Sequence, residues 1–326
     1  MIQNGQQLLS GVRGWLRRYV ALTPAQELVM AVWCLHTWVY ERLSRSTPYV
    51  EITGVSGSGK TTLMEAASLL CRGSLVTDTI RTMFICRRVS ETEGRLSLFV
   101  DEAEKLESAS FGDQRSMLAS GYRKGGVHGV TVGKGTETFP VWCPKMFTSL
   151  RTVTSVIHNR CIPVWMERSA ERAKDLAPLS LEWERAEATA QALISDYKRV
   201  CPSLFSLNYS GRTQKLAAAL TPEDRQTYAA AVAALEGDAT ADAPVDGGIN
   251  PVMPDHLVSE RDREIWSPLF TLAACLQLDE QTIRELTAAS VDLSALRGIE
   301  RKCDVRTVDE AGRERSYAVR LVQDCR

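Results

Sequence analysis

The sequence predicts an α/β protein whose core is a parallel sheet flanked by helices. Three observations carry this prediction. A glycine-rich turn at 54–61 stands between a short strand and a helix, a buried strand at 95–100 ends in two carboxylates, and further strands alternate with helical stretches. Parallel strands joined by helices bring their carboxyl ends to one edge of a sheet, so the turn and the carboxylates are expected to meet there.

Composition leaves most functions open. The chain has 326 residues, of which 44% are hydrophobic and 24% charged, and its formal net charge is −1. These values are typical of a globular protein and do not decide for or against nucleic acid, since a local basic surface can be balanced elsewhere. Nine scattered cysteines without a C-x-x-C pair argue against a disulfide framework, and four dispersed histidines do not suggest a metal site. The apolar segment 28–40 is too short to span a membrane, so we expect a soluble, cytoplasmic protein.

The segment GVSGSGKT fits the phosphate-loop pattern G-x-x-x-x-G-K-S/T. A strand at 49–53 precedes it and a helix over 62–70 follows, which aims backbone N–H groups and a helix N-terminus at one point. Lys60 is expected to neutralise the β- and γ-phosphates of a nucleotide, and the Thr61 hydroxyl to coordinate Mg²⁺. A chance glycine-serine turn before a helix is the alternative. The predicted nucleotide-binding residues are Gly54, Val55, Ser56, Gly57, Ser58, Gly59, Lys60, Thr61 and Thr62.

Two carboxylates follow the buried strand at 95–100. Asp101 is placed to hold Mg²⁺ through water opposite Thr61, and Glu102 to orient or deprotonate an attacking water. The alternative is a strand followed by an acidic helix cap, since Glu104 and Glu107 also favour a helix N-terminus.

The segment 121–135 is predicted to form a hairpin after a helix at 113–120. Its tip and flanks carry basic and aromatic side chains that would grip a phosphate backbone, although a solvated surface hairpin is an equally good interpretation. The predicted nucleic-acid contacts are Tyr122, Arg123, Lys124 and Lys134.

A core strand is expected at 139–147 and another at 161–166. Thr148 or Ser149, just past the first of these, would sense the γ-phosphate or position water. Arg160 precedes the second, where it would project toward the nucleotide of a neighbouring subunit. The alternative is an arginine that pairs with a core carboxylate.

The predicted organisation has five parts. These are a helical N-terminal extension at 1–46, a nucleotide-binding core at 47–168, a helical lid at 169–235, a linker or mobile loop at 236–256, and a small C-terminal helical unit at 257–326. The last segment breaks off without a capping signal, which suggests truncation from a longer protein.

With these motifs in this order, the chain resembles the additional-strand (AAA+-like) P-loop ATPases. More narrowly, it resembles a domain family of undefined biochemical function found in phage- and plasmid-encoded replication proteins that are often joined to primase modules. The resemblance is carried by GVSGSGKTTLME, LFVDEAEKL, GYRKGG, CPKMF, HNRCIPVWMER, REIWSPLFTLA and YAVRLVQDC.

The resemblance implies an ATP- and Mg²⁺-dependent motor of the helicase or translocase type that serves replication of a phage or other mobile element. It also implies a homo-oligomeric ring, such as a hexamer, that acts on single-stranded DNA. Lys60, Thr61, Asp101 and Glu102 match the family's catalytic positions, and Arg160 would be a finger supplied in trans. Two other functions stay open: a nucleotide-dependent switch or sensor in regulation or anti-phage defence that does not translocate, and a small-molecule kinase.

Overall fold

Five parallel strands form the central sheet, in the order β2-β3-β6-β1-β7. They are β1 (Tyr49–Gly54), β2 (Ser74–Thr77), β3 (Ser97–Val100), β6 (Lys145–Ser149) and β7 (Cys161–Met166). Ile52 of β1 lies opposite Thr148 of β6 and Val164 of β7. β1, β3 and β6 are buried along their whole length, as strands are when helices cover both faces of a parallel sheet. The prediction of a parallel α/β core is confirmed.

The computed structural model describes residues 2–78, 81–132, 135–153, 155–168, 175–206, 257 and 259–303. Lys134, residues 212–235 of the predicted lid, the predicted linker at 236–256 and residues 304–326 of the predicted C-terminal unit lie outside these ranges. No helix in the described ranges is long and apolar enough to cross a membrane.

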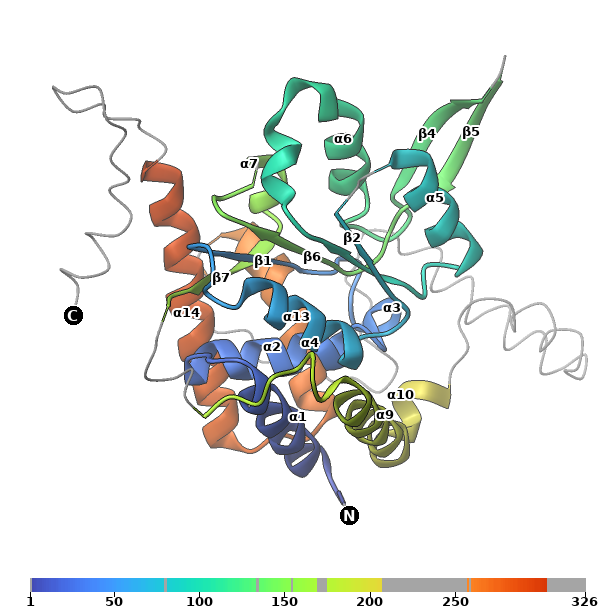
Figure 1. Cartoon of the computed structure of the whole chain (residues 1–326). Coiled ribbons are helices and arrows are strands. Elements are labelled where there is room, and N and C mark those ends of the chain that lie inside the picture. The colour runs from blue at the N-terminus through green and yellow to red at the C-terminus, as the bar shows by residue number, and fades with distance from the viewer. Residues whose placement is uncertain are drawn as a thin grey trace, which may run out of the picture.

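Helices cover both faces of the sheet (Figure 1). α4 (Lys60–Leu70) packs against β1, β3 and β6 on one face, and α7 (Ser155–His158) packs beside β7 on the other together with α6 (Gly112–Ser120). α5 (Thr82–Glu91) follows β2, and the short 3-10 turns η1 (Ala103–Glu107) and η2 (Ala109–Phe111) follow β3. Of the two residues that follow β3, Asp101 is half-buried and Glu102 is exposed.

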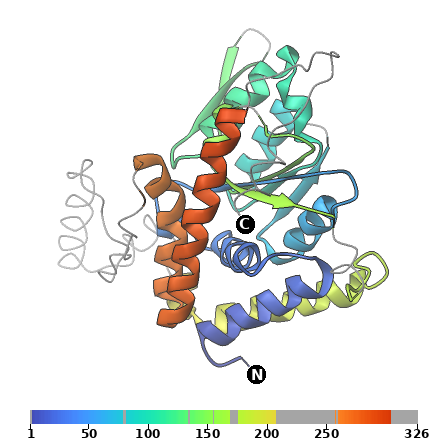
Figure 2. The ribbon, with the colours of Figure 1, turned by 90° about the vertical axis from the view of Figure 1, so that its left-hand side faces the viewer.

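The terminal helices share one hydrophobic core with the sheet. On the N-terminal side these are α1 (Gly5–Tyr19), α2 (Pro24–His36) and α3 (Tyr40–Leu43), and on the C-terminal side α9 (Trp183–Val200), α10 (Pro202–Ser206), α13 (Glu260–Cys275) and α14 (Glu280–Cys303). α2 is buried on every side, since it contacts α1, α4, α13 and α14. In Figure 2, α13 and α14 stand beside α2 and the sheet. α9 packs along α1 and α4.

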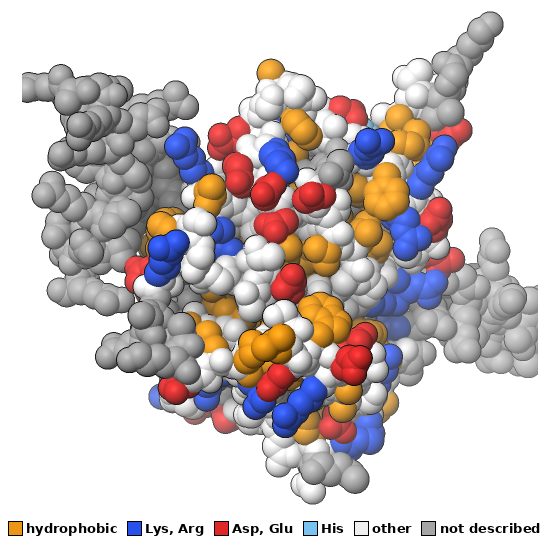
Figure 3. Space-filling view, viewed as in Figure 1, with side chains coloured by type: hydrophobic (Ala, Val, Ile, Leu, Met, Phe, Trp, Pro, Cys, Tyr) orange, Lys and Arg blue, Asp and Glu red, His pale blue; other side chains and the backbone are white. Residues whose placement is uncertain are grey.

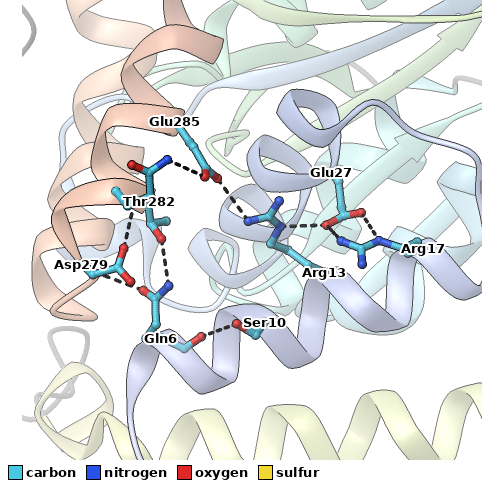
Figure 4. A network of polar contacts seen from close by, with 9 residues as sticks. Gln6, Ser10, Arg13, Arg17, Glu27, Asp279, Thr282 and Glu285 are labelled. Carbon is cyan, nitrogen blue, oxygen red and sulfur yellow. Dashed lines mark hydrogen bonds and ion pairs between the residues drawn. The ribbon is translucent and has the colours of Figure 1, made fainter.

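A polar network fastens α1, α2 and α14 together (Figure 4). Glu27, in the first turn of α2, is buried and accepts hydrogen bonds from Arg13 and Arg17 of α1. Burial would raise the pKa of Glu27, but the bonds from Arg17 and Arg13 outweigh it and hold the pKa below its ordinary value. Gln6 of α1 also donates to Thr282 of α14 at 2.8 Å. The N-terminal helices are therefore fixed to the core by charge as well as by apolar packing.

Two predicted boundaries were wrong. The hairpin consists of β4 (Val127–Val132) and β5 (Gly135–Pro140) rather than 121–135, and the core strand begins at Lys145 rather than at 139. Proline has no backbone N–H to donate within a central strand, so Pro140 and Pro144 end one strand and delay the next. Gly121–Gly126 instead forms the turn between α6 and β4, with a hydrogen bond from Gly126 N to Arg123 O.

Candidate functional site

The loop between β1 and α4 depends on glycine at two positions. Gly54 has a φ of 150°, and a Cβ there would lie 2.2 Å from the carbonyl oxygen of Met166. Gly59 is the N-cap of α4 and has a φ of 92°, in the left-handed region. Such conformations exclude most side chains. The first N–H groups of α4 have no partner within the helix, so they face the concavity of the loop.

Lys60 lies within this loop. Its Nζ donates to the carbonyl oxygens of Gly54 at 2.8 Å and Val55 at 2.9 Å. Burial lowers the pKa of Lys60, while the negative charges of Glu104 and Asp101 oppose that shift. The ammonium group of Lys60 therefore lies at the loop, near the carboxylates of Glu104 and Asp101.

Three side chains predicted from separate motifs meet at the carboxyl end of the sheet. The Thr61 hydroxyl donates to Asp101 Oδ2 at 3.4 Å, and the Thr148 hydroxyl donates to Asp101 Oδ1. Thr61 is the second residue of α4, Asp101 follows β3, and Thr148 lies in β6 between β1 and β3. The strand order therefore explains how residues far apart in the chain surround one carboxylate.

Glu102 has a different environment from Asp101. It is exposed, its φ is 52°, and its carboxylate forms an ion pair with Lys105. Left-handed backbone at a residue other than glycine costs on the order of 1–3 kcal/mol and is frequent at functional sites. Figure 3 shows acidic side chains gathered at the centre of this face.

Glu104 was missed as a site residue by the sequence reasoning, which treated it as a helix cap. Its Oε2 accepts a hydrogen bond from Leu150 N at 3.4 Å, just past the end of β6. Together with its effect on the pKa of Lys60, this contact places Glu104 among the groups around the loop. Its position three residues beyond Asp101 was the available signal.

The oxygen donors at this site suit a small divalent cation. Thr61 and Asp101 offer a hydroxyl and a carboxylate, which are ligands that Mg²⁺ accepts. Within the described part of the chain, no group of three or more His, Cys, Asp or Glu side chains could hold a metal. Further ligands would have to come from water or from a bound phosphate, which often complete the coordination of Mg²⁺ in proteins.

A cavity of about 320 Å³ adjoins the outer side of the loop. Its walls come from the end of α1, the glycine loop and the segment after β7: Tyr19, Val20, Ala21, Gly57, Ser58, Gly59, Thr62, Glu167, Arg168 and Leu176. Arg168 Nε donates to Ser56 O at 2.6 Å, which ties the segment after β7 to the loop. The sequence reasoning missed this cavity. Glu167 and Arg168 could have been found because they follow the strand beside β1, whereas the end of α1 arrives only by tertiary packing.

Arg160 lies at the opposite end of the sheet from the glycine loop. It precedes β7, and its carbonyl accepts a hydrogen bond from Tyr49 N at the start of β1. Its guanidinium donates to Val156 O and lies 5.7 Å from the centre of the Tyr122 ring, where Arg261 of α13 also lies at 5.3 Å. β1 separates Arg160 from the loop of its own chain by about 20 Å at 3.3 Å per residue.

Of the predicted nucleic-acid residues in the described part of the chain, Arg123 and Lys124 are exposed and Tyr122 is buried. Tyr122 is 1% exposed and packs edge-on against Tyr49, so its ring faces are not available to stack on a base. Arg123 forms an ion pair with Glu264 of α13. Lys124 is exposed, and its backbone N–H donates to Arg45 O at 2.7 Å. The buried ring does not support the nucleic-acid contact predicted for Tyr122, because Arg261 of α13 lies over it.

Comparisons with known proteins give no family. No protein-family model matches the chain, and no curated protein matches it in sequence. Two solved structures of the JCV helicase, the second with a small molecule bound, are each 17% identical to it. The first has a TM-score of 0.37 and the match covers 57% of this chain and 52% of that one; the second has a TM-score of 0.39, with 74% and 66% covered. The matches thus span about half to two thirds of the helicase chains, and likeness at this level is too slight to assign a fold family.

Proposed function

We propose that this protein is an ATP-hydrolysing, AAA+-like motor of the DNA helicase or translocase type that serves replication of a phage or other mobile element. The observation that carries the proposal is the meeting of Thr61, Asp101 and Thr148 at the mouth of the Gly54–Thr61 loop. A glycine loop without such neighbours would indicate only a turn between a strand and a helix. A glycine loop with a hydroxyl and a carboxylate from a neighbouring strand facing it is suited to a phosphate chain.

Each residue of the loop and its neighbours would have a distinct role. Lys60 would turn from the carbonyls of Gly54 and Val55 to the β- and γ-phosphates, since phosphate oxygens are better acceptors for an ammonium group than neutral carbonyls. Mg²⁺, held through Thr61 and Asp101, would neutralise charge on the phosphates. Glu102 would orient the attacking water after release from Lys105, and the cost of that release is small because the pair is exposed.

The strand order supports the AAA+-like class. β6 lies between β1, which the glycine loop follows, and β3, which Asp101 follows. An additional strand at this place puts Thr148 beside Asp101, where the proposed γ-phosphate sensor would be.

The cavity beside the loop is the proposed site of the nucleoside. Its volume of about 320 Å³ lies at the lower end of the range of small-ligand pockets. Tyr19, Val20 and Ala21 supply apolar contact on one side, and Glu167 and Arg168 supply polar groups on the other. A base and ribose held here would place the phosphates over Gly57–Thr61.

Arg160 is proposed as a finger for the neighbouring subunit of a homo-oligomeric ring. It lies too far from the loop of its own chain to act there, and the residue is half-buried at the amino end of the sheet. Arg261, whose guanidinium also lies over the Tyr122 ring, adds a second positive charge at the same place.

The test is steady-state ATP turnover with and without single-stranded DNA. Lys60→Ala is expected to lose nucleotide affinity, and Glu102→Gln to bind ATP and lose turnover, because an amide cannot accept a proton from water. Stimulation of the parent protein by DNA supports a motor, whereas turnover that ignores DNA supports a switch or sensor. A Glu102→Gln variant that hydrolyses ATP at the rate of the parent protein would remove Glu102 from the mechanism.

A further inference from the structure

Helix α5 presents an aromatic ring among arginines to solvent. Phe84 is 47% exposed, which is unusual for a side chain of its size, while Ile85, Cys86 and Val89 of the same helix are buried. Arg81 lies three residues before Phe84, and Arg87 and Arg88 lie three and four residues after it. This spacing places Phe84, Arg87 and Arg88 on one face of the helix, and Arg81 is its N-cap, with extended backbone.

Two of these arginines have no ion-pair partner among the described residues. Arg88 forms an ion pair with Glu91 at 2.9 Å, but neither Arg81 nor Arg87 has an ion-pair partner within the described ranges. An unpaired exposed cation is ordinary by itself. Two of them on either side of an exposed phenyl ring, in a chain of net charge −1, make a local cationic and aromatic face.

The hairpin lies beside this face. α5 contacts β5, and Figure 1 shows the hairpin projecting from the molecule next to α5. The described residues of β4 and β5 include no Lys or Arg, and Glu137 adds a negative charge. Figure 3 shows Lys and Arg side chains around hydrophobic ones over this corner of the molecule. The cationic groups here therefore come mainly from α5.

We propose that the exposed face of α5 binds single-stranded nucleic acid, with Arg81 and Arg87 on phosphates and Phe84 stacked on a base. Arg81 and Arg87 are about 9 Å apart along the helix axis at 1.5 Å per residue. At 3.4 Å per nucleotide in one strand, this distance matches about three nucleotides. Every base has a face that an aromatic ring can stack on, and in a single strand those faces are open.

This inference rests on the nucleic-acid partner in the proposed function, and it moves the contact from the turn at Tyr122 to α5. It does not depend on the glycine loop. Turnover of ATP without DNA is expected to be unchanged by substitutions on this face, so failure of the two proposals can be told apart.

The experiment measures binding of the full chain to a short fluorescent oligothymidine over a series of salt concentrations. For Arg81→Ala/Arg87→Ala we expect the slope of log K against log salt to fall by about 1.4, since each contact to a single strand contributes about 0.7. Phe84→Leu removes the ring and keeps an apolar side chain, and we expect binding about 5- to 150-fold weaker from the loss of one stacked base. Phe84→Tyr should bind as the parent protein does.

The matched control is Arg185→Ala/Arg284→Ala, which removes two exposed arginines from α9 and α14. It should leave the salt slope unchanged, and a fall equal to that of the α5 variant would show a general charge effect and overturn the proposal. Photo-crosslinking with an iodouracil oligonucleotide should label the peptide that contains Phe84. Unchanged affinity in the α5 variants, no binding of oligothymidine by the parent protein, or loss only of binding to anionic lipid vesicles would each overturn it as well.

Discussion

Charged side chains at the carboxyl end of the parallel sheet are more exposed than Lys145 at its amino end. At the carboxyl end, Lys60, Asp101 and Glu102 are all at least partly exposed. At the amino end, Lys145 is 1% exposed, and its Nζ donates to three carbonyl oxygens, those of Gly121, Val141 and Cys143, within 3.2 Å.

The difference separates ligand binding from stability. Burial lowers the pKa of Lys145, although the neighbouring Cys143 opposes the shift, and the Tyr49 ring lies 4.8 Å from the ammonium nitrogen. The donors of Lys145 are all satisfied within the fold, so it joins α6, the hairpin and β6. The groups at the carboxyl end keep hydrogen-bonding capacity for a ligand. We therefore expect substitutions at the carboxyl end to reduce turnover, and substitutions at the amino end to reduce stability.

Arg160 is an exception to this difference between the two ends. It lies at the amino end, yet it is proposed to act in turnover. Arg160→Ala is expected to reduce steady-state ATP turnover by about 10³- to 10⁵-fold, the effect measured for arginine fingers in GTPases. The loss arises because a guanidinium no longer meets the charge that spreads over the transferring phosphoryl oxygens. Turnover per subunit should also fall on dilution, since a lone subunit lacks its finger.

The matched control is Arg261→Ala, which removes the other cation over the Tyr122 ring. It should cost about 0.5–2 kcal/mol of unfolding free energy and much less turnover. Mixing Arg160→Ala with Lys60→Ala should restore part of the activity, because one variant supplies the site and the other the finger. Constant turnover per subunit down to concentrations at which the protein is monomeric would contradict the trans role. Unfolding of Arg160→Ala would favour the structural alternative.

Local patterns explain which parts of this molecule could be predicted. The glycine loop, its flanking strand and helix, and Asp101 depend on a few consecutive residues with strict conformational needs, such as Gly54 and Gly59. The strand at Cys161–Met166 is bounded as the apolar run indicates. The α/β class follows from these elements alone.

Long-range packing explains what could not be predicted. Tyr122 reads as an exposed aromatic residue beside basic ones, yet α13, which lies about 140 residues later in the chain, brings Arg261 over its ring. The cavity beside the loop requires Tyr19 from α1 and Arg168 from the segment after β7. No spacing in the sequence encodes either juxtaposition, because each depends on how the terminal helices dock.

Glu51 lies midway along β1, between the two ends of the sheet. It is fully buried, and its carboxylate accepts from Val153 N and contacts His158 Nδ1. It therefore fastens both sides of the connection that runs from Thr148 to Arg160. Glu51→Ala is expected to reduce the unfolding free energy by about 2–6 kcal/mol, because it leaves two buried donors without their acceptor. Urea denaturation measures it.

Glu51→Gln is the control, because an amide can accept from Val153 N and donate to His158 Nδ1 with almost the same shape. It should lose less than half as much stability as Glu51→Ala. A Glu51→Ala variant within about 1 kcal/mol of the parent protein would show that the connection is held by other contacts.

The pH dependence of the unfolding free energy tests the burial of His36. Of the effects predicted here, this one is the smallest. His36 lies one turn after Trp33, whose Nε1 donates to Pro48 O just before β1, and it is 0% exposed. Neither ring nitrogen has a hydrogen-bond partner within the described ranges. Burial lowers the pKa of His36 to about 3. An ordinary histidine in an unfolded chain has a pKa of about 6.5, so below that pH the unfolded chain takes up a proton that the folded chain does not.

The unfolding free energy should therefore fall as pH falls below about 6.5, by about 1.4 kcal/mol per pH unit and about 2 kcal/mol in all at pH 5. His36→Phe should lack this component, and it sacrifices no hydrogen bond because His36 makes none within the described ranges. Glu27, whose pKa is lowered, also loses its stabilising charge interactions in acid, so the measurement is the difference between the parent protein and His36→Phe in urea denaturation at pH 7 and pH 5. An identical pH dependence in the two proteins would mean that His36 is protonated in the folded state, and that the amino end can accommodate a charge as the carboxyl end does.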